Sequence, residues 1–145
     1  MKFSKSIYVT VLTLFLSFNA FSQNSEQFTT TRNLTFESSS KTQAINVKIP
    51  ENTGGLYIEI TCGVRKGNVT IEIYDPNGTK KGEFSVEALE TNELEKDDSL
   101  INFMKNGAIG EINKGIENPT FGVWKIKFIP ENATGQVEMK STLQS

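Results

Sequence analysis

The residues best suited to chemistry are carboxylates grouped in the second half of the chain. Glu93, Glu95, Asp97 and Asp98 fall within segment 87–99, which holds six acidic residues and one basic residue. Oxygen ligands of this kind suit Ca²⁺, so Glu95, Asp97 and Asp98 are the candidate metal ligands. Their spacing matches no recognisable calcium loop. A solvated acidic segment, in a loop or a polar helical turn, is the alternative interpretation.

Two tyrosines are the candidate ligand-binding residues. Tyr57 and Tyr74 lie on the polar sides of two alternating segments, 56–62 and 69–74, beside glutamates and threonines. Exposed aromatic side chains are typical of binding surfaces. The two tyrosines would therefore form one aromatic patch if these segments are neighbours. Ordinary cross-strand pairing on a half-solvated sheet is the alternative.

The only tryptophan and the only cysteine of the chain are both predicted to lie in the core. Trp124, the only tryptophan, shares its alternating side with Ile126 and Phe128, which predicts burial rather than a sugar-stacking platform. Cys62, the only cysteine, lies on an apolar side and is expected to be buried and inert. The chain has no histidine to act as a general base. A pair of carboxylates could hydrolyse a glycoside, but no pair stands out.

The first 22 residues predict export. A basic start precedes an apolar run at residues 7–18, and Ala20 and Ser22 occupy the −3 and −1 positions of a cut before Gln23. This arrangement is typical of a secretory signal peptide, and its ending, NAFSQ, resembles export signals of flavobacteria and their relatives. The run is shorter than the ~20 residues of a membrane span. We expect a secreted or periplasmic protein without stable membrane insertion after cleavage, with an uncleaved anchor as the alternative.

Charge limits the partners of the mature chain. It carries 13 basic and 17 acidic residues, a net charge of −4. Such a chain has no basic surplus with which to displace counterions, so nucleic acid is not expected as a partner. Its length predicts a single domain at 32–145 after a flexible lead-in at 23–31.

Short segments that alternate between apolar and polar residues dominate the domain. The clearest lie at 45–49, 56–62, 69–74 and 124–128, shorter ones at 34–36, 84–86 and 137–139, and 100–104 is apolar without clean alternation. A period of two is typical of strands with one buried side. Turn signals such as DPNG at 75–78 and CGVRKGN at 62–68 separate the segments. The pattern predicts an all-β fold, a single antiparallel β-sandwich of seven or eight strands with jelly-roll-like topology.

A near-repeat occurs between strands. IPENTGG at 49–55 and IPENATG at 129–135 each contain a proline that ends a strand. Asn52 and Asn132 tolerate left-handed backbone, and the glycines permit positive φ. We interpret the two copies as connectors of similar chemistry rather than as a binding motif or an internal repeat.

Residues 45–139 resemble bacterial pre-peptidase C-terminal domains and related P-domain-like sandwiches. The resemblance is carried by the passages GLYIEITCGVRKGNVTIEIYDPNGTKKG, NPTFGVWKIKF and ATGQVEM. It implies a β-sandwich with accessory or binding character, and it supplies no catalytic residue.

Together these patterns predict a non-enzymatic exported module that binds a protein or a glycan. No cofactor is expected, and Ca²⁺ at the acidic segment is the alternative. One alternative is a carbohydrate-binding module proper, which requires coplanar exposed aromatics. Another is a small hydrolase, which requires two carboxylates at a fixed separation in a cleft.

Overall fold

The computed structural model describes residues 26–89 and 107–145, which form an all-β antiparallel fold with no helix among them. The strands are β1 (Gln27–Ser39), β2 (Gln43–Ile49), β3 (Gly55–Tyr74), β4 (Lys80–Glu87), β5 (Ala108–Glu117) and β6 (Gly122–Gln144). Within this described part, no helix long and apolar enough to cross a membrane is found.

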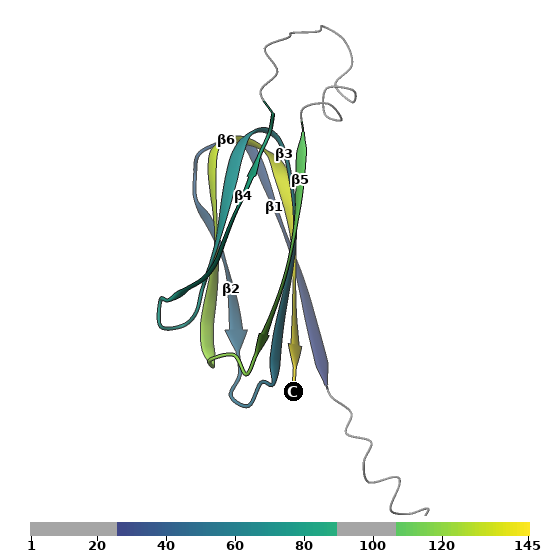
Figure 1. Cartoon of the computed structure of the whole chain (residues 1–145), viewed down its shortest axis with the longest axis vertical. Coiled ribbons are helices and arrows are strands. Elements are labelled where there is room, and N and C mark those ends of the chain that lie inside the picture. The colour runs from purple at the N-terminus through teal and green to yellow at the C-terminus, as the bar shows by residue number, and fades with distance from the viewer. Residues whose placement is uncertain (1–25, 90–106) are drawn as a thin grey trace, which may run out of the picture.

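Two long strands, β3 and β6, run through both layers of a β-sandwich (Figure 1). The end of β6, from residue 133, pairs with β1 and with the start of β3, and β5 completes this first layer. The start of β6 pairs with β2 and with the end of β3, and β4 completes the second layer. The strand order is therefore β1–β6–β3–β5 in the first layer and β2–β6–β3–β4 in the second.

The core fills the space between the layers. In β3 the even-numbered residues from Leu56 to Val64 are buried, whereas after the bend the odd-numbered residues from Val69 to Ile73 are buried. The alternation changes phase because the register of β3 against β6 shifts between Val64 and Asn68, as a β-bulge does. The predicted burial of Trp124 is confirmed: the side chain is 1% exposed.

The bends of β3 and β6 lie against each other. Gly67 has φ of +73°, and a Cβ added there would stand 2.2 Å from the carbonyl oxygen of Glu131. Asn132 has φ of +44° and Asn52 has φ of +65°, which confirms the left-handed backbone expected at both asparagines. The connector prediction is correct for IPENTGG, between β2 and β3, but wrong for IPENATG. The second copy is the bend of a continuous strand.

The predicted seven or eight strands appear as six in the described residues. Segments 56–62 and 69–74 both belong to β3, and segments 124–128 and 137–139 both belong to β6. The predicted turn CGVRKGN is the bend of β3.

The predicted flexible lead-in, 23–31, is wrong for its last five residues. Residues 27–31 belong to β1 and pair with residues 140–144 of β6, because their threonines are β-branched and suit a strand. The predictions for residues 1–25 and 90–106 lie outside the described residues. These include the signal peptide, segment 100–104 and the candidate ligands Glu95, Asp97 and Asp98.

Candidate ligand-binding face

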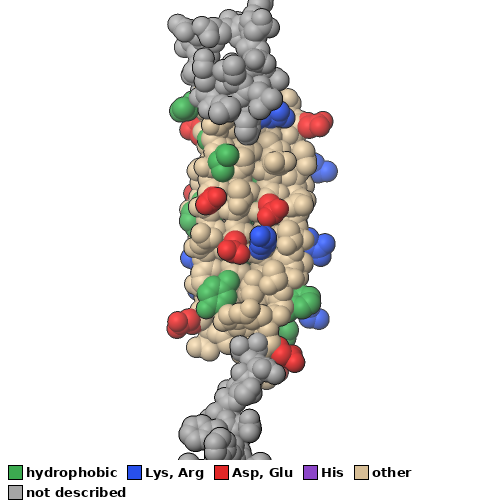
Figure 2. All heavy atoms as spheres, turned by 90° about the vertical axis from the view of Figure 1, so that its right-hand side faces the viewer, with side chains coloured by type: hydrophobic (Ala, Val, Ile, Leu, Met, Phe, Trp, Pro, Cys, Tyr) green, Lys and Arg blue, Asp and Glu red, His purple; other side chains and the backbone are tan. Residues whose placement is uncertain are grey.

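The outer surface of the first layer, which we call the first face, presents side chains in a regular grid. Its rows, each in the order β1, β6, β3, β5, are Thr35, Gln136, Gly63, Ile109; Asn33, Glu138, Thr61, Glu111; Thr31, Lys140, Glu59, Asn113; and Thr29, Thr142, Tyr57, Gly115. Hydroxyl, amide and carboxylate groups dominate this surface. Hydrophobic side chains stand above and below a charged centre (Figure 2).

Three hollows lie on the first face. The largest, about 750 Å³, surrounds Gly63 near the bends and reaches Arg65 and Ile109. A second, about 370 Å³, borders Tyr57, and a third, about 200 Å³, lies between them around Thr61. Tyr57 and Gly63 are six residues apart on β3, roughly 20 Å at the usual rise of a strand. The hollows therefore follow one line along the strand direction.

Tyr57 rests against the sheet in space left by two glycines. A Cβ added at Gly115, its cross-strand neighbour, would stand 3.2 Å from Cε1 of the ring, and one added at Gly55 would stand 3.2 Å from Cε2. Aromatic rings over strand glycines cover backbone that would otherwise be bare. Tyr57 remains 43% exposed. The part of the ring turned away from the glycines is thus open to a ligand.

The centre of the first face is acidic. Glu59, Glu111 and Glu138 are exposed there, with Lys140 as the cation between Glu59 and Glu138 in the grid. The Lys140 ammonium lies 3.8 Å from a carboxylate oxygen of Glu138. Among the described residues, no group of three or more acidic or cysteine side chains could hold a metal ion. The carboxylates at the centre offer acceptors for hydrogen bonds.

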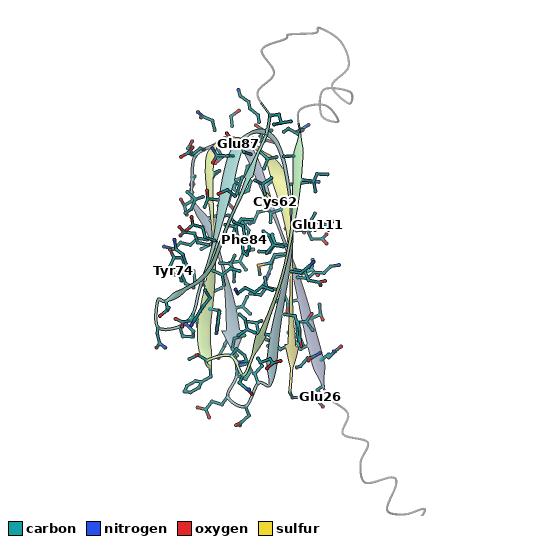
Figure 3. The ribbon with its side chains drawn as sticks, in the orientation of Figure 1. Glu26, Cys62, Tyr74, Phe84, Glu87 and Glu111 are labelled. Carbon is teal, nitrogen blue, oxygen red and sulfur yellow. The ribbon has the colours of Figure 1, made fainter. Side chains whose placement is uncertain are left out.

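The structure does not bring the two predicted tyrosines together. Tyr74 follows the bend of β3 and lies on the outer surface of the second layer, which we call the second face. Figure 3 shows Tyr74 and Glu111 on opposite outer sides of the sandwich. The single aromatic patch that the sequence suggested is absent, because the two layers separate the ends of one strand.

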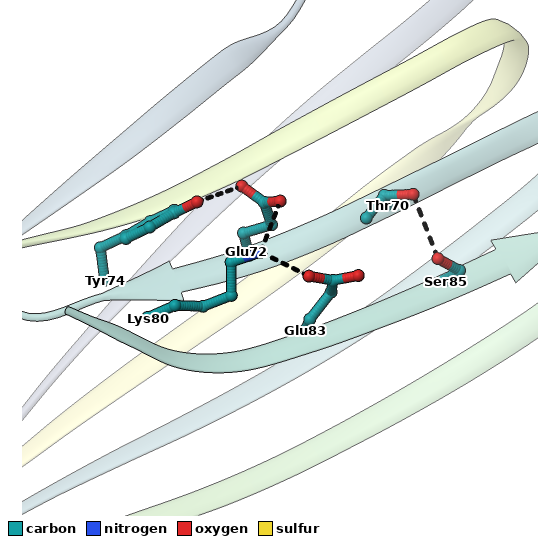
Figure 4. A network of polar contacts seen from close by, with 6 residues as sticks. All are labelled: Thr70, Glu72, Tyr74, Lys80, Glu83 and Ser85. Atoms are coloured by element: carbon teal, nitrogen blue, oxygen red, sulfur yellow. Dashed lines mark hydrogen bonds and ion pairs between the residues drawn. The ribbon is translucent and has the colours of Figure 1, made fainter. Parts of the chain in front are cut away.

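Tyr74 belongs to a network of side chains on the second face (Figure 4). Its hydroxyl donates to Glu72 at 2.6 Å, and the Lys80 ammonium binds both Glu72 and Glu83. The Lys127 ammonium stands 5.0 Å from the centre of the tyrosine ring. These contacts occupy both the hydroxyl and the ring of Tyr74.

The hydrogen bonds of this network shift the pKa values of Glu72, Tyr74 and Lys80. The hydrogen bond from Tyr74, followed by the one from Lys80, holds the pKa of Glu72 below its usual value. The same bond to Glu72 raises the pKa of Tyr74. Hydrogen bonds to Glu83 and then Glu72 raise the pKa of Lys80. The charged carboxylates and the neutral phenol thus stabilise one another.

The core positions of Cys62 and Trp124 exclude them from a surface site. Cys62 is fully buried, and burial raises the pKa of its thiol to about 11. The indole N–H of Trp124 donates to the carbonyl oxygen of Thr120 at 2.8 Å. Both residues lie where their alternation predicted.

Sequence reasoning missed most of the first face. Gly63, which leaves the largest hollow open, was interpreted only as part of a turn at 62–68. Gly115, which receives the ring of Tyr57, was assigned no role from the sequence. Ile109 is 67% exposed beside that hollow. The signal that would have found them is the register between β3 and β5, because it alone shows which glycine faces which side chain.

No family model matches this sequence, and no curated protein matches it. Solved structures resemble its fold. Latent dimeric PorU from Porphyromonas gingivalis has a TM-score of 0.51 and 9% identity, over 85% of this chain and 13% of PorU. A protein of Bacillus endospore appendages, which form disulfide-linked pili, has a TM-score of 0.44 and 15% identity, over 82% and 85% of the two chains.

A carbohydrate-binding module from Cellvibrio mixtus lichenase 5A, solved with cellotriose, has a TM-score of 0.38 and 15% identity, over 85% of this chain and 88% of the module. These likenesses concern the fold alone and identify no sequence family. The likeness to PorU supports the predicted resemblance at the level of a β-sandwich fold. The chain corresponds to a small part of PorU and to most of the other two chains.

Proposed function

We propose that this protein is an exported, non-catalytic binding module whose ligand lies on the first face. The observation that carries the proposal is the contrast in partners among the described side chains. On the second face, the hydroxyl of Tyr74 donates a hydrogen bond to Glu72. On the first face, Tyr57 is exposed among hydroxyl, amide and carboxylate groups. Export is supported by the signal-peptide pattern of the first 22 residues.

A glycan is the ligand class that this surface fits best. A sugar ring presents apolar C–H groups to an aromatic face and hydroxyl groups to its surroundings. Tyr57 offers the aromatic face, and the neighbouring threonine, asparagine and glutamate side chains offer donors and acceptors. The line of hollows from Tyr57 to Gly63 suits a linear chain of several units. The acidic centre disfavours an anionic glycan, so we propose an uncharged one.

Several features support a role without catalysis. The chain has no histidine, and its only thiol is buried with a raised pKa. The carboxylates Glu59, Glu111 and Glu138 stand on an open sheet surface, whereas catalytic acids usually owe their function to burial in a cleft.

The test is binding of soluble, uncharged polysaccharides to residues 23–145, measured by affinity electrophoresis and titration calorimetry. Gly63→Leu should weaken binding at least about tenfold, because a Cβ at Gly63 meets nothing within 4 Å and the new side chain would fill the hollow. Asn46→Leu, on the exposed second face, is the matched control and should bind like the wild type.

The salt dependence of the binding affinity distinguishes an uncharged glycan from a basic protein as the ligand. Binding to an uncharged glycan should be nearly the same at low and high salt, because exposed charges contribute little to it. Binding only to a basic protein, with affinity that falls steeply with salt, would replace the glycan by a protein partner. Equal loss in Gly63→Leu and Asn46→Leu would overturn the assignment to the first face.

A further inference from the structure

The four edge strands of the sandwich differ in how well they are protected. β4 carries four charged residues in eight, and β5 carries three in ten. β2 has seven residues, includes Lys48 and is followed by Pro50. β1 is the longest, with 13 residues, and has only Arg32 and Glu37 as charges. Natural proteins protect sheet edges with charges, prolines and short strands, so β1 is the least protected edge among the described strands.

The side chains of β1 suit pairing with another strand. It pairs with β6 along one side, and it stands at the end of the strand order. Segment 27–31 has no charge and three consecutive threonines, which favour strand pairing. Phe28 is 67% exposed although it lies on the same side of the strand as Leu34 and the buried Phe36.

We propose that β1 pairs antiparallel with β1 of a second copy of this chain, about a two-fold axis at Thr31. Antiparallel pairing of a strand with its own copy generates a closed two-fold dimer. The two first layers would then form one continuous sheet. This inference does not depend on the identity of the ligand.

The apolar side chains select this register. Core-facing residues must pair with core-facing residues if the joined sheet is to keep one side buried. An axis at Thr31 places Phe28 opposite Leu34 of the partner subunit, which covers both apolar side chains, and places Arg32 opposite the partner's Thr30. An axis at Arg32 would instead oppose two like charges directly, which is unfavourable.

The dimer would enlarge the binding surface. β1 forms one border of the first face, so pairing through it would set the two first faces side by side in one sheet. Two copies of Tyr57 would then face the same direction. A repetitive polymer could engage both copies at once, which raises the effective affinity without new contacts.

Cysteine crosslinking tests the register. In Thr31→Cys the two introduced thiols would lie directly opposite each other, about 5 Å apart at Cβ, close enough for an intermolecular disulfide after a small adjustment. In Thr29→Cys the two thiols would be separated by four residues along the strand, roughly 14 Å, and should not crosslink. Native Cys62 is fully buried and should not contribute.

Sedimentation velocity of the unmodified mature protein tests the dimer itself. It should show a monomer–dimer equilibrium that depends on protein concentration. Thr31→Lys should weaken the dimer at least tenfold, because it places like charges at the axis. Thr61→Lys, which adds the same charge to the middle of the first face, should leave the dimer unchanged.

A wild-type protein that remains monomeric at high micromolar concentration would overturn the proposal. So would crosslinking through Thr29→Cys in place of Thr31→Cys, because it would show another register. If Thr31→Cys does not fold, as judged by Trp124 emission, sedimentation of the wild type, Thr31→Lys and Thr61→Lys still tests whether the dimer forms through β1.

Discussion

The two outer faces of the sandwich are built from the same two long strands but present their polar groups differently. On the second face, Tyr74, Glu72, Lys80 and Glu83 bind one another, and Thr70 shares a hydrogen bond with Ser85. On the first face, the described side chains interact through the pair Thr29 and Thr142 and through the long contact between Lys140 and Glu138. The polar side chains of the second face form hydrogen bonds with one another, whereas most of those on the first face are available to solvent or to a ligand.

The difference shows that an outward-facing aromatic residue is not by itself a binding residue. Tyr57 and Tyr74 belong to one strand, face outward and have glutamate two residues away in the sequence. Tyr74 donates its hydroxyl to Glu72, whereas the ring of Tyr57 lies over Gly115 and Gly55. What separates them is the set of neighbours that the sheet register supplies.

The bend at Gly67 creates the two faces, so its substitution should have the largest effect. Gly67→Ala would force a Cβ to within 2.2 Å of the Glu131 carbonyl oxygen, at a backbone with positive φ. We expect a loss of roughly 3 kcal/mol in the free energy of unfolding, near the upper end for single substitutions. Denaturant unfolding, followed by the emission of buried Trp124, measures it.

Gly63→Ala is the matched control, four residues earlier in β3. A Cβ at Gly63 meets nothing within 4 Å, so the change should alter the free energy of unfolding by less than about 0.5 kcal/mol. Equal effects at Gly67 and Gly63 would contradict the close packing of the two bends.

The strands and the core were predictable because alternation reports directly on burial. Ile45, Val47 and Ile49 alternate with polar residues in the sequence and are buried as expected. The continuity of β3 was not predictable in the same way. Its bend uses Gly67 in a left-handed conformation together with a bulge, and in sequence this combination is indistinguishable from a turn.

The candidate site was only half predictable. Tyr57 was identified because it lies opposite the apolar side of its strand, and the same rule identified Tyr74. The rule reports which side of a strand faces solvent, but it does not report which layer the strand has entered. The glycine pair under Tyr57 depends on the register of β5 against β3, and this register is set by tertiary packing.

Alanine substitution of the two tyrosines sharpens the comparison of the faces. Tyr57→Ala should weaken binding of an uncharged polysaccharide about tenfold or more, because it removes the aromatic surface open to a sugar ring. Tyr74→Ala should bind like the wild type, because the ring and hydroxyl of Tyr74 are already engaged within the second face. Titration calorimetry with the same polysaccharide measures both.

Tyr57→Phe keeps the ring and separates stacking from hydrogen bonding. If stacking dominates, this variant should retain most of the affinity that Tyr57→Ala loses. Loss of binding in Tyr74→Ala with retention in Tyr57→Ala would reverse the roles assigned to the two faces.

The smallest expected effect concerns the network of the second face. Glu72→Gln removes the main cause of the raised pKa of Tyr74, so the Tyr74 phenol should deprotonate at lower pH in an ultraviolet titration.

The folded-state pKa of Glu72 is lowered, so the stability that Glu72 contributes is present at neutral pH and lost as pH falls through that pKa. The wild type should therefore lose slightly more Tm than Glu72→Gln between pH 7 and pH 3. The difference should be on the order of 2 °C, because Lys80 is exposed and solvent screens its pairing with Glu72. Glu111→Gln, on the first face, should change neither the phenol titration nor this difference. An effect of Glu111→Gln as large as that of Glu72→Gln would mean that the first face is also internally bonded, and the contrast between the faces would be lost.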